Sequence, residues 1–123
     1  ARMFGANPLI VPVPLHPSRL RERDYNQAAL LARRLAIASA MPLDESALVR
    51  VRHTSSQVRT HSRIERLDNM RGAFAVAHPE TVANRDIILV DDVCTTGATL
   101  EDCARALKEA GSHSVSAIVL ARG

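Results

Sequence analysis

The stretch ILVDDVCTTGATL, residues 88–100, decides the fold of this chain. It joins the end of an apolar run, residues 87–90, to two adjacent carboxylates, Asp91 and Asp92, and then to a loop rich in threonine and glycine. The apolar run is typical of a strand in the interior of a sheet. Two like charges at the end of such a strand lower stability unless hydroxyl or positive groups meet them. These residues therefore indicate a ligand site.

The size and composition of the chain are those of one soluble domain. Its 123 residues, with an apolar fraction of 46% and a charged fraction of 24%, are enough for one core. No apolar run approaches the ~18 residues of a membrane span, and no signal-peptide pattern is present. The two cysteines, Cys94 and Cys103, predict neither a disulfide framework nor a zinc site, so we expect a reducing, cytoplasmic location.

Positive charge is concentrated in the first part of the chain and is almost entirely arginine. Residues 1–72 contain 12 arginines against six acidic residues, whereas residues 73–123 contain four basic and seven acidic residues. Arginine suits phosphate because its planar fork donates two parallel hydrogen bonds. A general coding preference for arginine explains the same excess. The near absence of aromatic residues argues against the stacking surfaces of proteins that bind single-stranded nucleic acids.

Hydrophobic periodicity predicts strands that alternate with helices. The predicted strands are residues 8–15, 47–52, 73–77, 87–90 and 115–121, and the predicted helices are residues 24–39 and 98–110. The first helix has a capping box formed by Asp24 and Gln27, and Gly111 is suited to follow the end of the second. Helices that link strands in this order predict an α/β fold with a mainly parallel sheet.

Residues 53–72 are a segment of a different kind. They show no strong apolar period, and a loop of this length inside a compact domain is more often functional than idle.

The residues after the acidic pair are suited to a phosphate group. In open α/β sheets, ligands bind beyond the carboxyl ends of the strands. The run CTTGAT, residues 94–99, offers threonine hydroxyls, a glycine and the start of a helix, a combination that binds phosphate monoesters. A P-loop is disfavoured because no GxxxxGK[ST] pattern occurs. Carboxylates beside a phosphate fit a pair of ligand hydroxyls, and a ribose 5-phosphate has both groups.

The run IILVDDVCTTGATL, residues 87–100, resembles the ribose-phosphate signature of type I phosphoribosyltransferases. The resemblance implies the type I phosphoribosyltransferase fold, a mainly parallel sheet flanked by helices with a flexible lid loop. It also implies that Asp91 and Asp92, the catalytic pair, hold the ribose hydroxyls of phosphoribosyl pyrophosphate (PRPP), with Mg²⁺ bound nearby through PRPP and not by the protein alone. The 5-phosphate would be bound by Thr95, Thr96, Gly97, Ala98 and Thr99.

Three further runs narrow the resemblance. Residues 11–36 (VPVPLHPSRLRERDYNQAALLARRLA), 50–57 (RVRHTSSQ) and 63–74 (RIERLDNMRGAF) resemble the ComF/GntX group, amidophosphoribosyltransferase-like proteins linked to competence and DNA uptake. The resemblance implies a pyrophosphate loop with His16, Arg19, Arg23, Asn26 and Gln27. It implies a flexible lid with Thr54, Gln57, Arg66 and Asn69.

The chain departs from this group at two points. Asp24 stands where the group usually has glycine before the aromatic-Asn-Gln run, and an acid there opposes anion binding. The cysteine-rich zinc ribbon that the group commonly carries at its N-terminus is absent. We therefore expect residues 1–123 to be a single phosphoribosyltransferase domain, the core of a longer protein.

Three classes of function follow from these observations. The first is a Mg²⁺-dependent glycosyltransferase of nucleoside metabolism that transfers the phosphoribosyl group from PRPP to an unidentified acceptor and releases pyrophosphate. The second is a non-catalytic PRPP-binding accessory protein that contacts DNA-uptake proteins. The third is direct nucleic-acid binding by the arginine-rich part. A homo-oligomer is compatible with each.

Simpler interpretations exist for several of these residues. Asp91 and Asp92 could form a Walker-B-like magnesium site or a phospho-acceptor pocket, although the chain has no P-loop. Cys94 is either a thiol activated by a helix dipole or a small filler residue. The five histidines lack metal-ligand spacing, and Arg33 and Arg34 are expected on a solvated helix face.

Overall fold

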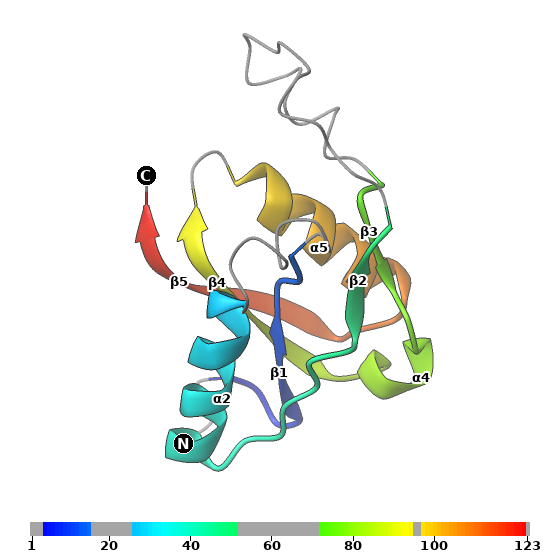
Figure 1. The fold of residues 1–123 in the computed structure, drawn as a ribbon. Helices are drawn as coiled ribbons and strands as arrows, with labels where there is room; N and C mark the ends of the chain where they lie inside the picture. The colour runs from blue at the N-terminus through cyan, green and yellow to red at the C-terminus, as the bar shows by residue number, and fades with distance from the viewer. Residues whose placement is uncertain (1–3, 16–25, 52–71, 95–96, 123) are drawn as a thin grey trace, which may run out of the picture.

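Three parallel strands form the centre of the molecule. The computed structural model describes residues 4–15, 26–51, 72–94 and 97–122. Within them, β1 (Pro8–Pro12), β4 (Asp86–Cys94) and β5 (Ser114–Arg122) form a sheet in the order β1-β4-β5 (Figure 1). The expectation of a mainly parallel α/β sheet is confirmed.

The central strand β4 is longer than its neighbour β1. The β1–β4 pairs run from Pro8↔Asp86 to Pro12↔Val90, whereas the β4–β5 pairs continue to Cys94↔Arg122. The N–H of Val13 still donates to the carbonyl of Val90 at 2.9 Å. Proline has no N–H to add to a ladder, and β1 ends at Pro12, short of the predicted residue 15.

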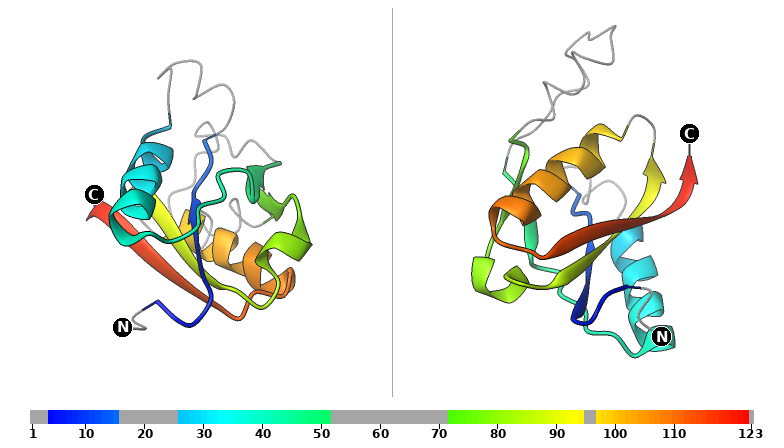
Figure 2. Two further views of the ribbon diagram at one scale, coloured as in Figure 1. Left: turned by 90° about the horizontal axis from the view of Figure 1, so that it is seen from below. Right: turned by 180° about the vertical axis from the view of Figure 1, so that it is seen from behind.

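One helix covers each face of the sheet (Figure 2). Helix α2 (Gln27–Ser39) packs on the face where Ile88 and Val90 point, and α5 (Ala98–Glu109) packs on the face of Ile87 and Leu89. This alternation follows from the two-residue period of a strand. In the described ranges, no helix has the length and apolarity needed to cross a membrane.

The start of α2 differs from the prediction. The helix begins at Gln27, and the side chain of Asn26 caps it by accepting from the N–H of Ala28 at 2.9 Å. The predicted capping box of Asp24 and Gln27 is therefore wrong. Leu30 is 38% exposed, whereas Ala28, Ala29 and Ala32 of the same helix are buried.

The remaining strands form a separate antiparallel ribbon. β2 (Leu48–Arg50) pairs with β3 (Phe74–Val76), and Phe74 lies in the core on the α5 side. Sequence periodicity predicted both strands but not their separation from the parallel sheet. It also missed the short helix α4 (Pro79–Val82). The predicted lid between β2 and β3 lies outside the described residues.

A buried carboxylate joins three segments at the N-terminal end of β4. Asp86 accepts hydrogen bonds from the hydroxyl of Ser114 at 2.7 Å and from the N–H of Asn7 at 3.1 Å, and Nδ1 of His113 lies 2.8 Å from its Oδ1. These bonds favour the charged form and hold the pKa of Asp86 well below its usual range. Ionised Asp86 therefore stabilises the fold.

Replacing Asp86 with Asn is expected to lower the melting temperature at pH 7. Because the pKa is lower in the folded state, the contribution of Asp86 is present above about pH 4 and is lost as the pH falls. The difference in melting temperature between the wild type and Asp86→Asn should therefore stay constant from pH 7 to about pH 5 and should narrow as the pH falls below about 4. Glu80→Gln, at an exposed carboxylate, is the control, and a difference independent of pH would contradict the assignment.

Candidate functional site

The acidic pair lies where β4 extends beyond β1. Asp91 and Asp92 follow Val90, the last residue paired with β1, and Asp91 is still paired with Val119 of β5. The prediction that β4 ends before the two acids is wrong, since the strand continues to Cys94. Both side chains are partly buried. The carboxyl end of β4 thus presents two carboxylates beyond its last pair with β1.

The two carboxylates are held in place by local hydrogen bonds. Asp91 accepts from the N–H of Asp92 at 2.9 Å, and Asp92 accepts from the N–H of Val93 at 2.9 Å. Alternation along β4 directs Asp91 to the α5 side of the sheet and Asp92 to the α2 side. A ligand that contacts both must therefore lie across the end of the strand.

Asp91 has an unusual protonation equilibrium. Burial raises its pKa from 3.8 to about 6, the neighbouring Asp92 carboxylate adds to the rise, and the N–H of Asp92 opposes it. Asp91 is therefore a desolvated acid close to a like charge. Strongly shifted acids of this kind are more frequent at functional sites than elsewhere in proteins.

Helix α5 begins close in sequence to the acidic pair. Its N-cap is Gly97, whose φ of 82° lies in the left-handed region that favours glycine. A Cβ built on Gly97 would meet no described atom within 4 Å, so the backbone conformation, and not crowding, is what requires glycine here. Ala98 is buried and Thr99 is partly buried in the first turn. The positive end of the helix dipole favours an anion at this position.

The other predicted site residues are only partly described. Asn26 lies at the same edge of the sheet, because its amide donates to the carbonyl of Val13 at 3.1 Å while its oxygen caps α2. Both ends of this amide are thus engaged within the chain, and Gln27 is exposed. The remaining predicted residues of the phosphate site, pyrophosphate loop and lid lie outside the described residues: Thr95, Thr96, His16, Arg19, Arg23, Thr54, Gln57, Arg66 and Asn69.

Two residues were missed by the sequence analysis. Asp102 is buried on α5 and forms an ion pair with Arg105, with 2.8 Å between Oδ1 and Nε. The sequence offers one signal, because an arginine follows Asp102 three residues later within the predicted helix 98–110. In the part of the chain that the structure describes, no group of three or more His, Cys, Asp or Glu side chains could hold a metal ion.

Comparison with known proteins identifies the class of this domain. The sequence model of the phosphoribosyl transferase domain matches residues 26–123. The chain therefore belongs to the phosphoribosyltransferase domain family, as the acidic pair and the following loop predicted.

Within this class, the chain is similar to proteins named for competence and DNA utilization. It is 38% identical over 114 residues to competence protein F of Haemophilus influenzae, 35% identical to DNA utilization protein YhgH of Escherichia coli K12 and 36% identical to competence protein ComFC of Bacillus subtilis. These alignments cover 92–93% of the chain and 44–49% of the relatives. The chain thus spans about half the length of the curated relatives it matches, and the predicted resemblance to the ComF/GntX group is confirmed.

A solved structure supports the fold. Glutamine PRPP amidotransferase from B. subtilis, complexed with ADP and GMP, matches 94% of this chain and 22% of its own chain with a TM-score of 0.59. The sequences are 20% identical, so this likeness shows the type I phosphoribosyltransferase fold alone.

Replacing Asp91 with Asn is expected to stabilise the protein at neutral pH. Its pKa is higher in the folded than in the unfolded state, so ionisation between about pH 4 and pH 6 destabilises the fold. Asparagine does not ionise, and we expect a gain of about 1 kcal/mol at pH 7.5 after allowance for solvent screening. Urea unfolding at pH 7.5 and pH 4 measures it, with Glu101→Gln as control. A gain that persists unchanged at pH 4 would contradict this cause.

Proposed function

We propose that this domain binds PRPP at the carboxyl end of β4 and transfers its phosphoribosyl group to an acceptor with release of pyrophosphate. The observation that carries the proposal is the juxtaposition of a carboxylate pair beyond the last β1 pair with the start of α5. A ribose 5-phosphate has hydroxyls that can donate to the carboxylate pair and a phosphate anion that suits the start of α5. Membership of the phosphoribosyltransferase domain family supports the same ligand.

Asp91 and Asp92 would accept hydrogen bonds from the vicinal ribose hydroxyls. A neutral diol can approach the pair without the repulsion that a bare phosphate would meet there. Hydroxyl donors also favour the charged form of Asp91, so ligand binding would lower its raised pKa. The ligand would thereby relieve the unfavourable ionisation of Asp91.

The 5-phosphate would lie at the start of α5. Gly97 turns the backbone into the helix there, and Thr99 in the first turn adds a hydroxyl. The loop threonines Thr95 and Thr96 belong to the same proposed phosphate site.

In the transfer, the bond between ribose C1 and pyrophosphate breaks, the pyrophosphate oxygen takes the bonding pair, and the acceptor forms the new bond to C1. The partial positive charge on the ribose lies close to Asp91 and Asp92, which favours this charge separation. Their carboxylate oxygens suit a hard cation such as Mg²⁺, which one or two carboxylates usually hold together with the phosphates of a substrate. Mg²⁺ bound with PRPP would neutralise the charge of the leaving pyrophosphate.

A second candidate function is a binding role without turnover. The names of the relatives, competence protein and DNA utilization protein, support an accessory role in which the PRPP-bound domain contacts proteins of DNA uptake. Both functions require the ligand site, and they differ in turnover. Release of pyrophosphate from PRPP in the presence of candidate bases would assign the enzyme, whereas binding without release would assign the accessory role.

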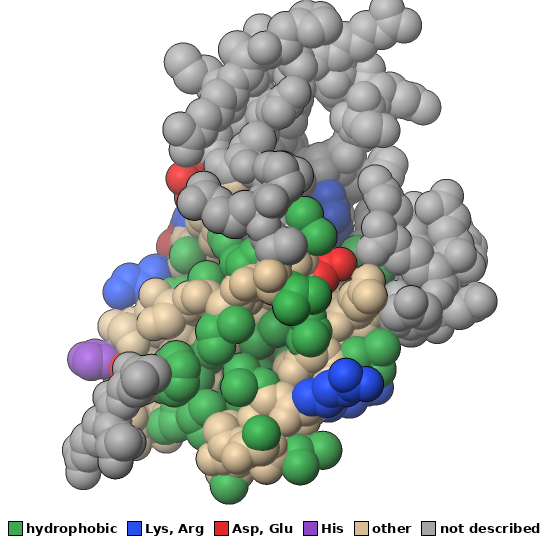
Figure 3. All heavy atoms as spheres, turned by 90° about the vertical axis from the view of Figure 1, so that its left-hand side faces the viewer, with side chains coloured by type: hydrophobic (Ala, Val, Ile, Leu, Met, Phe, Trp, Pro, Cys, Tyr) green, Lys and Arg blue, Asp and Glu red, His purple; other side chains and the backbone are tan. Residues whose placement is uncertain are grey.

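Direct nucleic-acid binding has less support among the described residues. Arg33 pairs with Glu45, Arg85 donates to the carbonyl of Pro8, and Arg105 pairs with Asp102. On the face in Figure 3, the described basic side chains are separated by hydrophobic ones. Such binding would weaken steeply with salt because phosphate contacts release counterions.

Titration calorimetry with PRPP and Mg²⁺ tests the proposed function. The wild type should bind, and the double variant Asp91→Asn/Asp92→Asn should lose at least tenfold in affinity, because an amide is a weaker acceptor for the ribose hydroxyls than a carboxylate. The matched control is Glu80→Gln/Glu109→Gln, which makes the same charge change at exposed positions and should bind normally.

The sign of the expected change makes this test selective. Removing two negative charges should strengthen the binding of an anionic ligand if charge alone mattered. Undiminished or tighter binding by the Asp91/Asp92 double variant would therefore contradict the site.

A further inference from the structure

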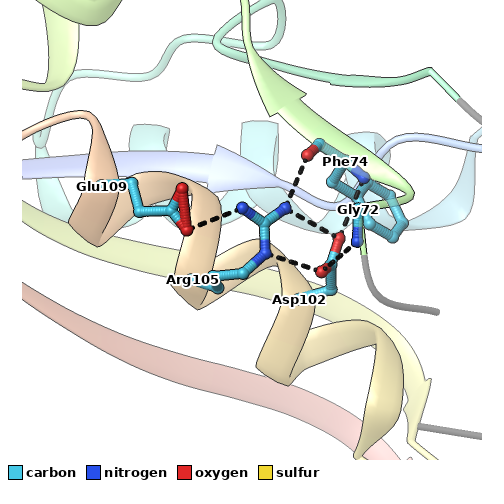
Figure 4. A network of polar contacts seen from close by, with 5 residues as sticks. All are labelled: Gly72, Phe74, Asp102, Arg105 and Glu109. Carbon is cyan, nitrogen blue, oxygen red and sulfur yellow. Dashed lines mark hydrogen bonds and ion pairs between the residues drawn. The ribbon is translucent and has the colours of Figure 1, made fainter. Parts of the chain in front are cut away.

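Helix α5 holds the start of β3 through a buried carboxylate (Figure 4). Asp102 is 5% exposed and accepts from the N–H groups of Gly72 at 2.8 Å and Phe74 at 3.0 Å. It also accepts from Nε of Arg105 at 2.8 Å and from Nη2 at 3.3 Å. Each carboxylate oxygen thus has one backbone donor and one guanidinium donor.

Asp102 and Arg105 of α5 take the place of a neighbouring strand along one edge of β3. The N–H of Phe74 donates to Asp102, and its carbonyl accepts from Nη2 of Arg105 at 3.1 Å. On the β2 side, the carbonyl of Ala73 accepts from the N–H of Val51 at 2.8 Å. Strand edges need partners for their backbone groups. Here the helix supplies them and fixes the position of β3.

Packing alone does not require a carboxylate at this position. A buried charge loses several kcal/mol of hydration, and apolar side chains of similar size often replace buried ion pairs without loss of stability. Burial raises the pKa of Asp102, but Arg105 and the two N–H groups outweigh it and leave the pKa below its usual value. The Asp102 carboxylate is therefore charged and fully hydrogen-bonded, and its bonds specify one arrangement of α5 and β3.

This arrangement also places the start of α5. Asp102 lies one helical turn after Ala98, so the contact that fixes Asp102 also fixes Gly97 and the dipole end of the helix. Binding geometry is sensitive to displacements of about 1 Å.

Glu109 lies at the exposed end of the same network. It pairs with Nη1 of Arg105 at 2.9 Å and makes no bond to β3 in the described structure.

We propose that Asp102 is a positioning residue that couples ligand binding at the start of α5 to the hydrogen bonds of Gly72 and Phe74. This inference rests on the proposed function, since it names a determinant of the same site. It requires that ligand binding and the α5–β3 contact strengthen each other by the same factor, because coupling between two equilibria is reciprocal.

The first test compares the PRPP affinity of Asp102→Asn and Glu109→Gln with that of the wild type in the presence of Mg²⁺. Both variants remove one negative charge from α5, and charge alone predicts slightly tighter binding of an anion. The positioning role predicts the opposite for Asp102→Asn, a loss of about fivefold or more. Glu109→Gln should keep or slightly increase the affinity.

The second test needs no variant. NMR-detected hydrogen exchange of the Gly72 and Phe74 amides in the wild type should slow when PRPP and Mg²⁺ are added. It therefore remains decisive even if Asp102→Asn does not fold.

Arg105→Lys keeps the charge but loses the forked contact with Asp102. Its PRPP affinity should therefore fall, but by less than that of Asp102→Asn.

The outcomes separate the two proposals. If the wild type binds PRPP but Asp102→Asn binds equally tightly or more tightly, the positioning role is wrong and the proposed function stands. Ligand binding that leaves the exchange of Gly72 and Phe74 unchanged overturns the coupling in the same way. If the wild type binds no PRPP, the proposed function fails, and the coupling fails with it.

Discussion

Hydrogen bonding along β4 changes at Val90, and the site depends on this change. Up to Val90 the strand is paired with β1 and β5, and beyond it the strand ladder continues only with β5. Pairing on both sides fixes the direction of β4 up to Val90, and Asp91 and Asp92 lie beyond the last pair with β1. The two helices pack on the faces of the same strand, so the start of α5 is placed relative to the carboxylates by the core itself.

Ionisation of Asp86 and Asp102 stabilises the fold, whereas ionisation of Asp91 destabilises it. Asp86 and Asp102 accept enough hydrogen bonds to hold their pKa values below the usual range, so their charged forms stabilise the fold. Asp91 is partly buried next to Asp92, and its pKa is raised to about 6. A protein selected for stability alone would not keep a carboxylate with a raised pKa at this position. The contrast with Asp86 and Asp102 supports a binding role for Asp91.

Sequence reasoning predicted the parts of this structure that depend on local pattern. The apolar run before Asp91, the glycine before α5 and the alternation of helices and strands all act over a few residues, and they predicted the parallel sheet and the helices α2 and α5. The N-cap at Asn26 was missed because the choice between Asp24 and Asn26 depends on the contact with Val13. Asp102 was missed because its partners Gly72 and Phe74 are distant in sequence. The separation of the β2–β3 ribbon likewise depends on tertiary packing.

The most direct test of a phosphate site at the start of α5 is an NMR titration of the ¹⁵N-labelled chain with PRPP and Mg²⁺. Glycine amides usually resolve well, and Gly97 and Gly111 lie at opposite ends of α5. We expect large shifts of the Gly97, Asp91 and Asp92 resonances, and little change at Gly111. A titration that shifts other resonances while Gly97 and the acidic pair stay in place would contradict this expectation.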